Sequence, residues 1–159
     1  MTDPTWRLAI GSDSAGLDYK EILLADLQGD ARVTSVVDLG VPREDPNGKS
    51  YGEVGIRLAE MVAAGEIDRG ILVCGTGIGV AISANKVAGV RATVAHDSFS
   101  VERSILSNDC QVLTLGQRVI GAELARRLVR EWLGYVFDPS SPSEEKVQVI
   151  RDYESRTAS

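Results

Sequence analysis

The chain has 159 residues, a net charge of −6 and an isoelectric point near 4.8. This length suits one domain that buries its own core, so we expect a single domain over residues 1–159. The acidic balance argues against nucleic acid as the main partner, and no apolar run approaches the roughly 20 residues of a membrane span. The segment 1–7 lacks the pattern of a signal peptide. Two cysteines make no disulfide framework, which predicts a reducing, cytoplasmic location.

The first half of the chain alternates strand and helix patterns. An apolar run over 8–11 predicts a strand, and an apolar stripe over 18–27 predicts a helix. A second strand is expected over 33–39, followed by a glycine- and proline-rich loop over 40–48. Ser50, with a glutamate three residues later, is typical of a capping box at the start of the next helix.

The second half continues the alternation. Its predicted elements, in chain order, are a strand over 70–73, a helix from 80, a strand over 92–95, a helix from 98 to about 106, a strand over 112–115, a helix over 122–133 and a helix over 144–156. Strands that alternate with helices favour βαβ units and a parallel sheet. We therefore predict an α/β fold: a Rossmann-like, doubly wound, five-stranded parallel sheet with helices on both faces.

The last predicted helix differs from the others. It follows a proline-containing break at 138–143 and carries only a thin apolar face of Val147, Ile150 and Tyr153. Such a face is too small for an independent unit. We expect this helix to pack on a partner subunit.

The segment 74–79 reads Cys-Gly-Thr-Gly-Ile-Gly and directly follows the apolar run 70–73. A glycine loop between a buried strand and a helix directs backbone N–H groups toward a ligand and favours negative charge there. Neither the dinucleotide fingerprint nor the Walker motif fits, because the spacing and the residues that follow are wrong for both. A tight turn alone needs fewer glycines. We therefore predict that Gly75, Gly77 and Gly79 belong to an anion cradle.

Cys74 lies at the end of the third predicted strand, beside this cradle. Cysteine is commonly buried as a small hydrophobic residue, and composition alone favours that interpretation. The position reverses the preference, because the field of the loop favours a thiolate, which can act as a base. Cys110 has no such surroundings and is predicted to pack in the core.

Ligands of parallel α/β sheets bind outside the carboxyl ends of the strands, where Asp13, Ser14 and His96 are expected. The pattern around Asp13 favours catalysis and helix capping equally, and capping is a serious alternative for Ser14. His96 is the only histidine; its position allows a role in the site, although a lone histidine is more often structural. One histidine and two dispersed cysteines form no ligand cluster, so no metal site is predicted.

Together these motifs resemble the type-B ribose-5-phosphate isomerase family, which also contains the galactose-6-phosphate isomerase subunits. The resemblance extends from about Leu8 to Ile150, nearly the whole chain. It rests on four segments: 11–16, 74–79, 84–91 and 116–121. It implies an aldose–ketose isomerase for a sugar phosphate that needs no cofactor. It also implies a site at a homodimer interface, with tetramers left open.

The resemblance implies roles for individual residues. Cys74 is then the base that moves a proton between carbons 1 and 2 of the open-chain sugar, with Asp13 and Thr76 assisting. The glycine loop holds the enediolate oxygens, and Arg118 binds phosphate with its planar fork. The substrate-binding candidates, by resemblance or by position in the crevice, are Ser14, Gly75, Gly77, Ile78, Gly79, His96, Ser107, Asn108, Arg118 and Lys146.

The sequence departs from the family pattern at three points. Ser14 replaces a histidine that helps to bind phosphate in the family. Ser107, before Asn108, replaces the histidine that opens the furanose ring. The C-terminal pair of phosphate-binding arginines is missing, and Lys146 is the nearest cation. These losses argue against unaltered ribose-5-phosphate chemistry.

A tetrose phosphorylated on its terminal hydroxyl cannot close a five-membered ring, because the required oxygen is esterified. An enzyme for such a substrate needs no ring-opening histidine. With the segments 96–100 and 106–108, this resembles the branch of the family that interconverts D-erythrulose 4-phosphate and D-erythrose 4-phosphate in erythritol breakdown. The alternatives are a ribose-5-phosphate isomerase, a non-catalytic phosphate- or nucleotide-binding module, and one subunit of a hetero-oligomeric hexose-phosphate isomerase.

Overall fold

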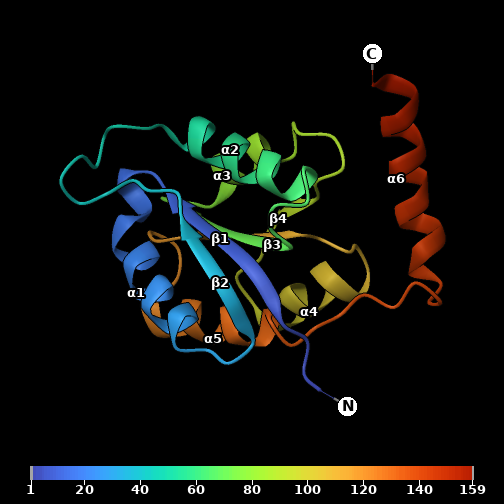
Figure 1. Cartoon of the computed structure of the whole chain (residues 1–159), viewed down its shortest axis with the longest axis horizontal. Coiled ribbons are helices and arrows are strands. Elements are labelled where there is room, and N and C mark those ends of the chain that lie inside the picture. The colour runs from blue at the N-terminus through green and yellow to red at the C-terminus, as the bar shows by residue number, and fades with distance from the viewer. Residues whose placement is uncertain (1, 159) are drawn as a thin grey trace.

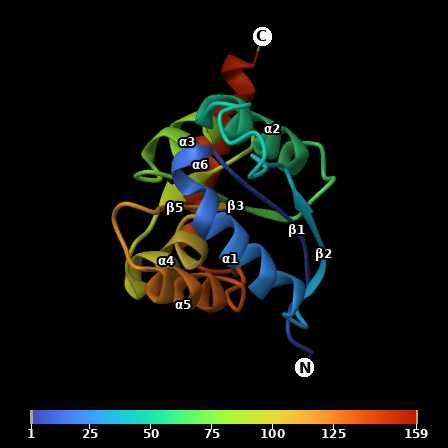
Figure 2. The same ribbon diagram turned by 90° about the vertical axis from the view of Figure 1, so that its left-hand side faces the viewer.

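A five-stranded parallel sheet forms the centre of the structure, with helices on both faces (Figures 1 and 2). The computed structural model describes residues 2–158. The strands are β1 (Trp6–Ser12), β2 (Val33–Asp38), β3 (Arg69–Cys74), β4 (Ala92–Val94) and β5 (Val112–Gly116). Their order across the sheet is β2-β1-β3-β5-β4, and every neighbouring pair is parallel. The predicted doubly wound sheet is confirmed.

All helices except the last divide between the two faces of the sheet. They are α1 (Leu17–Gln28), α2 (Tyr51–Ala63), α3 (Ile78–Ala84), α4 (Ser98–Leu106), α5 (Ala122–Trp132) and α6 (Ser143–Thr157), with a short 3-10 turn η1 at Ser14–Gly16. Figure 2 shows α1, α4 and α5 on one face and α2 and α3 on the other. None of the helices within residues 2–158 is both long and apolar enough to cross a bilayer.

Along each strand the side chains alternate between the two faces of the sheet, and each face has its own hydrophobic core. On β3, Ile71 and Val73 pack in the core that contains α1, α4 and α5, whereas Leu72 and Cys74 pack against α2 and α3. Successive side chains of a strand point to opposite faces, so the register of β3 directs the Cys74 sulfur toward the α2–α3 layer.

Gly16 allows the turn after β1 to lie against the end of β3. A Cβ at Gly16 would overlap the carbonyl oxygen of Val73 and would lie 2.9 Å from the nitrogen of Cys74. Only a residue without a side chain fits there. The segment after β1 and the end of β3 are therefore held in direct contact.

Two helix starts were predicted from the sequence and are confirmed. Ser50 caps α2 by accepting from the Glu53 N–H, while the Glu53 carboxylate accepts from the Ser50 N–H. Asp97 caps α4 by accepting from the Ser100 N–H at 2.7 Å. These caps fix where both helices begin above the carboxyl edge of the sheet.

The burial pattern of α1 differs from the prediction. Ile22 was expected in the buried stripe, but its side chain is exposed, and Lys20 is only 2% exposed. The Lys20 ammonium donates to both oxygens of Asp38 and to the Val41 carbonyl, each at 3.0 Å. These partners follow in later segments of the chain, so helical periodicity alone could not reveal them.

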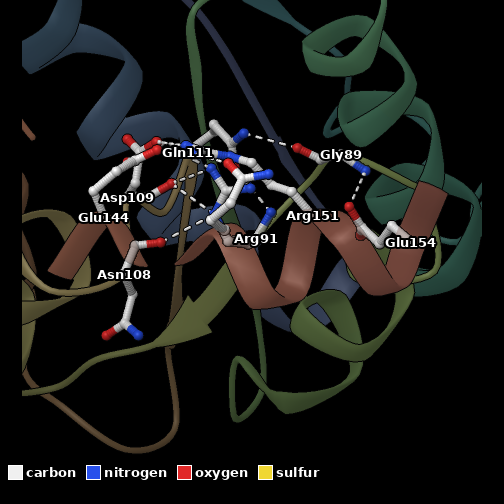
Figure 3. A network of polar contacts seen from close by, with 9 residues as sticks. Gly89, Arg91, Asn108, Asp109, Gln111, Glu144, Arg151 and Glu154 are labelled. Atoms are coloured by element: carbon white, nitrogen blue, oxygen red, sulfur yellow. Dashed lines mark hydrogen bonds and ion pairs between the residues drawn. The ribbon is translucent and has the colours of Figure 1, made fainter. Parts of the chain in front are cut away.

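α6 lies beside the sheet and is attached mainly through polar groups (Figures 1 and 3). Arg151 pairs with Asp109 at 3.1 Å, and its other terminal nitrogen pairs with Glu144 of α6 itself. Glu154 accepts from the backbone N–H of Gly89 at 3.1 Å. The helix is thus tied to the loops that flank β4 and β5.

The predicted apolar face of α6 is only partly free. Val147 is buried within its own chain, which corrects the prediction that it packs on a partner subunit. Ile150 and Tyr153 are exposed.

Candidate active site

A cleft opens at the carboxyl ends of β1 and β3, the two central strands from which the connections run in opposite directions. Ligands of open α/β sheets bind at this kind of switch point. The cleft has a volume of about 430 Å³ and is lined by residues that follow β1, β3 and β5 and by the first residue of α2: Asp13, Ala15, Tyr51, Cys74, Gly75, Thr76, Ile78, Gly79, Ile82 and Arg118. The structure therefore brings most of the predicted cradle together.

Cys74 lies at the base of the cleft. Its side chain is 4% exposed, and its sulfur accepts a hydrogen bond from the Gly77 N–H at 3.1 Å. Gly77 has a φ of 79° and lies against the backbone of Leu115, a conformation and a space that require glycine. Thr114 of β5 fixes the same turn by donating to the Gly77 carbonyl at 2.8 Å. The thiol thus faces a loop whose shape is set by its neighbours.

The remaining N–H groups of the loop differ in availability. The Ile78 N–H donates to the Thr76 hydroxyl at 3.2 Å, so this pair closes the turn into α3. The N–H groups of Gly75 and Thr76 make no hydrogen bond with residues 2–158. These two donors lie beside the thiol and are available to an oxygen of a ligand.

Arg118 forms one wall of the cleft. A Cβ at Gly75 would lie 3.3 Å from a terminal nitrogen of Arg118, so the guanidinium lies over the glycine loop. The backbone is held there by two hydrogen bonds, from Gln117 N to the Cys74 carbonyl at 2.9 Å and from Arg118 N to the Gly75 carbonyl at 3.0 Å. Arg118 is exposed and forms no ion pair among the residues that the structure describes. Its charge is available to an anion.

Asp13 caps a helix, which is one of the two roles between which the sequence did not decide, and it also borders the cleft. One carboxylate oxygen accepts from the N–H groups of Ala15 and Gly16, at 2.9 and 3.2 Å, and so caps η1. Asp13 and Cys74 both line the cleft. Ser14, the next residue, is exposed and does not line the cleft.

His96 does not line the cleft. Its Nε2 accepts from the N–H of Gly116 at 2.9 Å. Partial burial lowers the pKa of His96 below its usual 6.5, and the negative charge of Asp97 acts in the opposite direction. The imidazole contacts the end of β5, not the space in front of Cys74.

Three other predicted residues lie outside the cleft of this chain. Ser107 is the C-cap of α4, and Lys146 is exposed on α6. Asn108 borders a separate cavity of about 590 Å³ beside β4, and its side-chain amide points away from the network around Arg91 (Figure 3). One chain alone therefore does not bring these residues to Cys74.

Tyr51, Ala15 and Ile82 line the cleft but were not among the predicted site residues. A Cβ at Gly79 would lie 2.8 Å from the Tyr51 ring, so the aromatic side chain covers the glycine loop. Tyr51 could have been predicted from its position, because it is the first residue of the helix that follows the long loop at the carboxyl edge of the sheet. The periodicity of α3 places Ile82 one turn beyond Ile78, on the same face.

The site offers a thiol, a carboxylate, a hydroxyl, free backbone donors and a guanidinium. Residues 2–158 contain no cluster of three or more histidine, cysteine or acidic side chains placed to hold a metal ion. This arrangement suits proton transfer next to a carbonyl group of an anionic substrate, with charge on oxygen stabilised by backbone donors.

Comparison with known proteins agrees with this chemistry. Residues 8–150 match the family model described as Ribose/Galactose Isomerase. A D-erythrulose-4-phosphate isomerase 2 of Mycolicibacterium smegmatis is 57% identical, over 93% of this chain and 97% of that enzyme. A D-erythrulose-4-phosphate isomerase of Pectobacterium atrosepticum is 43% identical, over 88% and 91%. The ribose-5-phosphate isomerase B of Clostridium thermocellum superposes with a TM-score of 0.87 at 36% identity, covering 94% and 98%.

The chain therefore belongs to the ribose/galactose isomerase family of sugar-phosphate isomerases. The resemblance stated from the motifs is confirmed.

Proposed function

We propose that this protein is an aldose–ketose isomerase that interconverts D-erythrulose 4-phosphate and D-erythrose 4-phosphate. The observation that carries the proposal is the juxtaposition of the Cys74 thiol with two groups that have no partner within residues 2–158: the N–H groups of Gly75 and Thr76 and the guanidinium of Arg118. The named activity of the relatives that are 57% and 43% identical supports the choice of substrate.

The reaction begins when the Cys74 thiolate takes a proton from C1 of the open-chain ketose. The C1–H electrons form a double bond to C2, and negative charge moves to the C2 oxygen. The N–H groups of Gly75 and Thr76 stabilise that oxygen; a preorganised donor of this kind is worth roughly 3–4 kcal/mol in comparable sites. A turn fixed by Gly77 keeps these donors in place without further reorganisation.

The intermediate is then reprotonated on the neighbouring carbon. Asp13 accepts the proton of the C1 hydroxyl and passes a proton to the C2 oxygen. Cys74 returns its proton to C2, the electrons of the double bond form that C–H bond, and the C1 oxygen becomes the aldehyde carbonyl. The thiolate is regenerated, so one base serves both half-reactions.

Arg118 binds the phosphate group, because a guanidinium matches phosphate geometry and stays charged at every working pH. A serine at position 107 is compatible with a substrate that is already open-chain. A hydroxyl does not titrate near neutral pH and cannot replace a histidine in acid–base ring opening. A substrate whose phosphate blocks ring closure does not need that step.

We further propose that the chain forms a homodimer. Sedimentation measures whether dimers pair into tetramers. Asn108, Ser107 and Lys146 lie outside the cleft of their own chain, so a second subunit is needed to bring them to it. Ile78 and Ile82 leave apolar surface exposed beside the cleft, and Ile150 and Tyr153 do so on α6. Burial of such surface is a driving force for association.

A cytoplasmic location agrees with two free cysteines and a phosphorylated metabolite.

A substrate panel tests the activity. The purified chain is assayed with aldose and ketose phosphates of four, five and six carbons. The highest kcat/KM is expected for D-erythrulose 4-phosphate, with weak turnover of ribulose 5-phosphate and the poorest turnover of cyclic ribose 5-phosphate. A higher kcat/KM on ribose 5-phosphate favours the pentose alternative. No turnover of any sugar phosphate by the single chain favours the binding module or the hetero-oligomer.

Two further measurements accompany the panel. Sedimentation at assay concentration is expected to give a dimer or a larger species, and an active monomer contradicts the shared site. Treatment with a chelator is expected to leave the rate unchanged, because no step of the proposed reaction uses a metal.

A further inference from the structure

His96 occupies a specific place where the sheet ends. β4 pairs with β5 from Ala92 to Val94, and the Ala95 N–H still donates to the Thr114 carbonyl. The main chain then turns away to begin α4, and Gly116 loses a main-chain partner on that side. The His96 imidazole supplies the acceptor instead, with Nε2 2.9 Å from the Gly116 nitrogen.

Gly116 is the residue where β5 turns into the segment that carries Arg118. It lies so close to the glycine loop that a Cβ there would be 2.6 Å from the backbone of Thr76. The N–H groups of residues 116, 117 and 118 all have acceptors: His96 Nε2, the Cys74 carbonyl and the Gly75 carbonyl. His96 is the one side chain among these three acceptors.

We propose that His96 is a positioning residue whose neutral imidazole holds the β5–α5 segment, and with it Arg118, against the glycine loop. The inference rests on the proposed isomerase function, because Arg118 is its phosphate ligand. His96 acts through Gly116 and does not touch the substrate.

Protonation state decides whether the contact exists. An Nε2 that accepts from an N–H carries no proton, so the imidazole is neutral with its proton on Nδ1. An imidazolium would turn a second donor toward the Gly116 N–H and would break the hydrogen bond. Partial burial disfavours the imidazolium, Asp97 favours it, and the facing residues of β5, from Thr114 to Gly116, are uncharged. Acidification is therefore expected to weaken binding of the sugar phosphate.

Two variants distinguish the effect of losing the hydrogen-bond acceptor at position 96 from the effect of losing the imidazole ring. His96→Gln keeps an acceptor oxygen at a similar reach and cannot titrate, whereas His96→Leu removes the acceptor and keeps an apolar side chain. Leaving the buried Gly116 N–H without an acceptor is unfavourable. We expect His96→Leu to raise KM about tenfold with a smaller change in kcat, and His96→Gln to restore the wild-type KM at neutral pH.

The decisive measurement compares KM of the wild-type protein and the two variants between about pH 5 and pH 8. The substrate phosphate itself ionises near pH 6, so the difference between wild type and His96→Gln carries the test. The proposal requires KM of the wild type to rise more steeply on acidification than KM of His96→Gln. Equal profiles overturn it, and so does a wild-type KM for His96→Leu at neutral pH.

A second readout does not depend on turnover. The chain has a single histidine, so imidazole ¹⁵N NMR of the tag-free protein reports His96 alone. The Nδ1–H tautomer is expected at neutral pH, and an Nε2–H tautomer overturns the proposal. If the wild type fails to isomerise the tetrulose phosphate, the proposed function fails, while the tautomer still shows whether His96 Nε2 accepts from the Gly116 N–H.

Discussion

The sulfur of Cys74 accepts a hydrogen bond from the N–H of Gly77, three residues further along the same loop, at 3.1 Å. The contact stabilises negative charge on the sulfur. It also fixes the orientation of the side chain relative to the free N–H groups of Gly75 and Thr76. The base and the donors for the developing oxyanion thus belong to one turn, so a small change in that turn affects both.

Cys74→Ala tests the base directly. Loss of a positioned general base is expected to lower kcat by roughly 10²–10⁴-fold, with the fold retained, because alanine fits the space of the thiol. The matched control is Cys110→Ala. Cys110 is equally buried but borders a different cavity, and burial raises its pKa to about 11, so it stays a thiol at neutral pH. Steady-state kinetics and circular dichroism on both variants decide; wild-type turnover by Cys74→Ala would refute the mechanism.

Substitution separates the observed capping role of Asp13 from its proposed role in proton transfer. Asparagine keeps an oxygen that can cap η1, so Asp13→Asn is expected to keep its stability but to lose at least about 10²-fold in kcat. Asp13→Ala loses the cap as well, at about 1 kcal/mol of unfolding free energy. Denaturant titration and kinetics measure the two effects independently. Full activity of Asp13→Asn would leave Asp13 with capping alone.

Arg118→Ala is expected to raise KM for the sugar phosphate by roughly 10–100-fold, since a hydrogen bond to a charged group contributes about 1.5–3 kcal/mol. Arg118→Lys should recover only part of this loss, because an ammonium lacks the planar fork. Arg127→Ala is the control: Arg127 is exposed on α5, pairs with Glu131 and lies outside the cleft. An unchanged KM in Arg118→Ala would exclude this residue as the phosphate ligand.

Gly16→Ala is expected to destabilise the protein by roughly 3 kcal/mol, because the added methyl group meets backbone atoms of β3 that cannot rotate away. Gly121→Ser is the control. Within residues 2–158, nothing lies within 4 Å of a Cβ at Gly121, which is the N-cap of α5, and serine is a favourable N-cap. The free energy of unfolding should therefore fall in Gly16→Ala and should stay the same or rise in Gly121→Ser, so that the two variants differ by several kcal/mol.

The pKa of His96 predicts a pH dependence of stability. Because the folded state lowers this pKa below 6.5, the unfolded chain binds the proton more readily. The contribution of His96 to stability is complete above pH 6.5 and is lost as the pH falls through the lower pKa of the folded state. The stability difference between wild type and His96→Gln should follow this course in denaturant titrations. A difference that is constant with pH would contradict it.

Much of the fold was predictable because the strands and caps depend on local sequence. The five predicted strands differ from the observed ones by at most two residues at either end, and the capping box at Ser50 is present. The order β2-β1-β3-β5-β4 was not predictable from periodicity, because it depends on how the connections cross the sheet. The buried Lys20 and the exposed Ile22 were missed for the same reason: Asp38 and the Val41 carbonyl lie in other segments.

The site was predictable where its residues are contiguous and less so elsewhere. The glycine loop at 74–79 could be recognised from its composition and from its position after a predicted strand. The role of His96 depends on a hydrogen bond to Gly116, twenty residues away, which no motif encodes. Tyr51 reaches the cleft only because the capping box of α2 sets where that helix begins.

The attachment of α6 has a consequence for the cooperativity of the fold. Val147 is the only residue of this helix that is fully buried, and the other contacts that attach it include the partly exposed ion pair of Arg151 with Asp109 and the hydrogen bond from the Gly89 N–H to Glu154. Such ion pairs contribute about 0–1 kcal/mol each and weaken as salt is added. In the isolated subunit α6 is therefore a low-stability unit that undocks before the sheet unfolds. Backbone amides of α6 exchange with solvent through an opening that leaves β3 and its glycine loop folded, and added salt accelerates that exchange selectively.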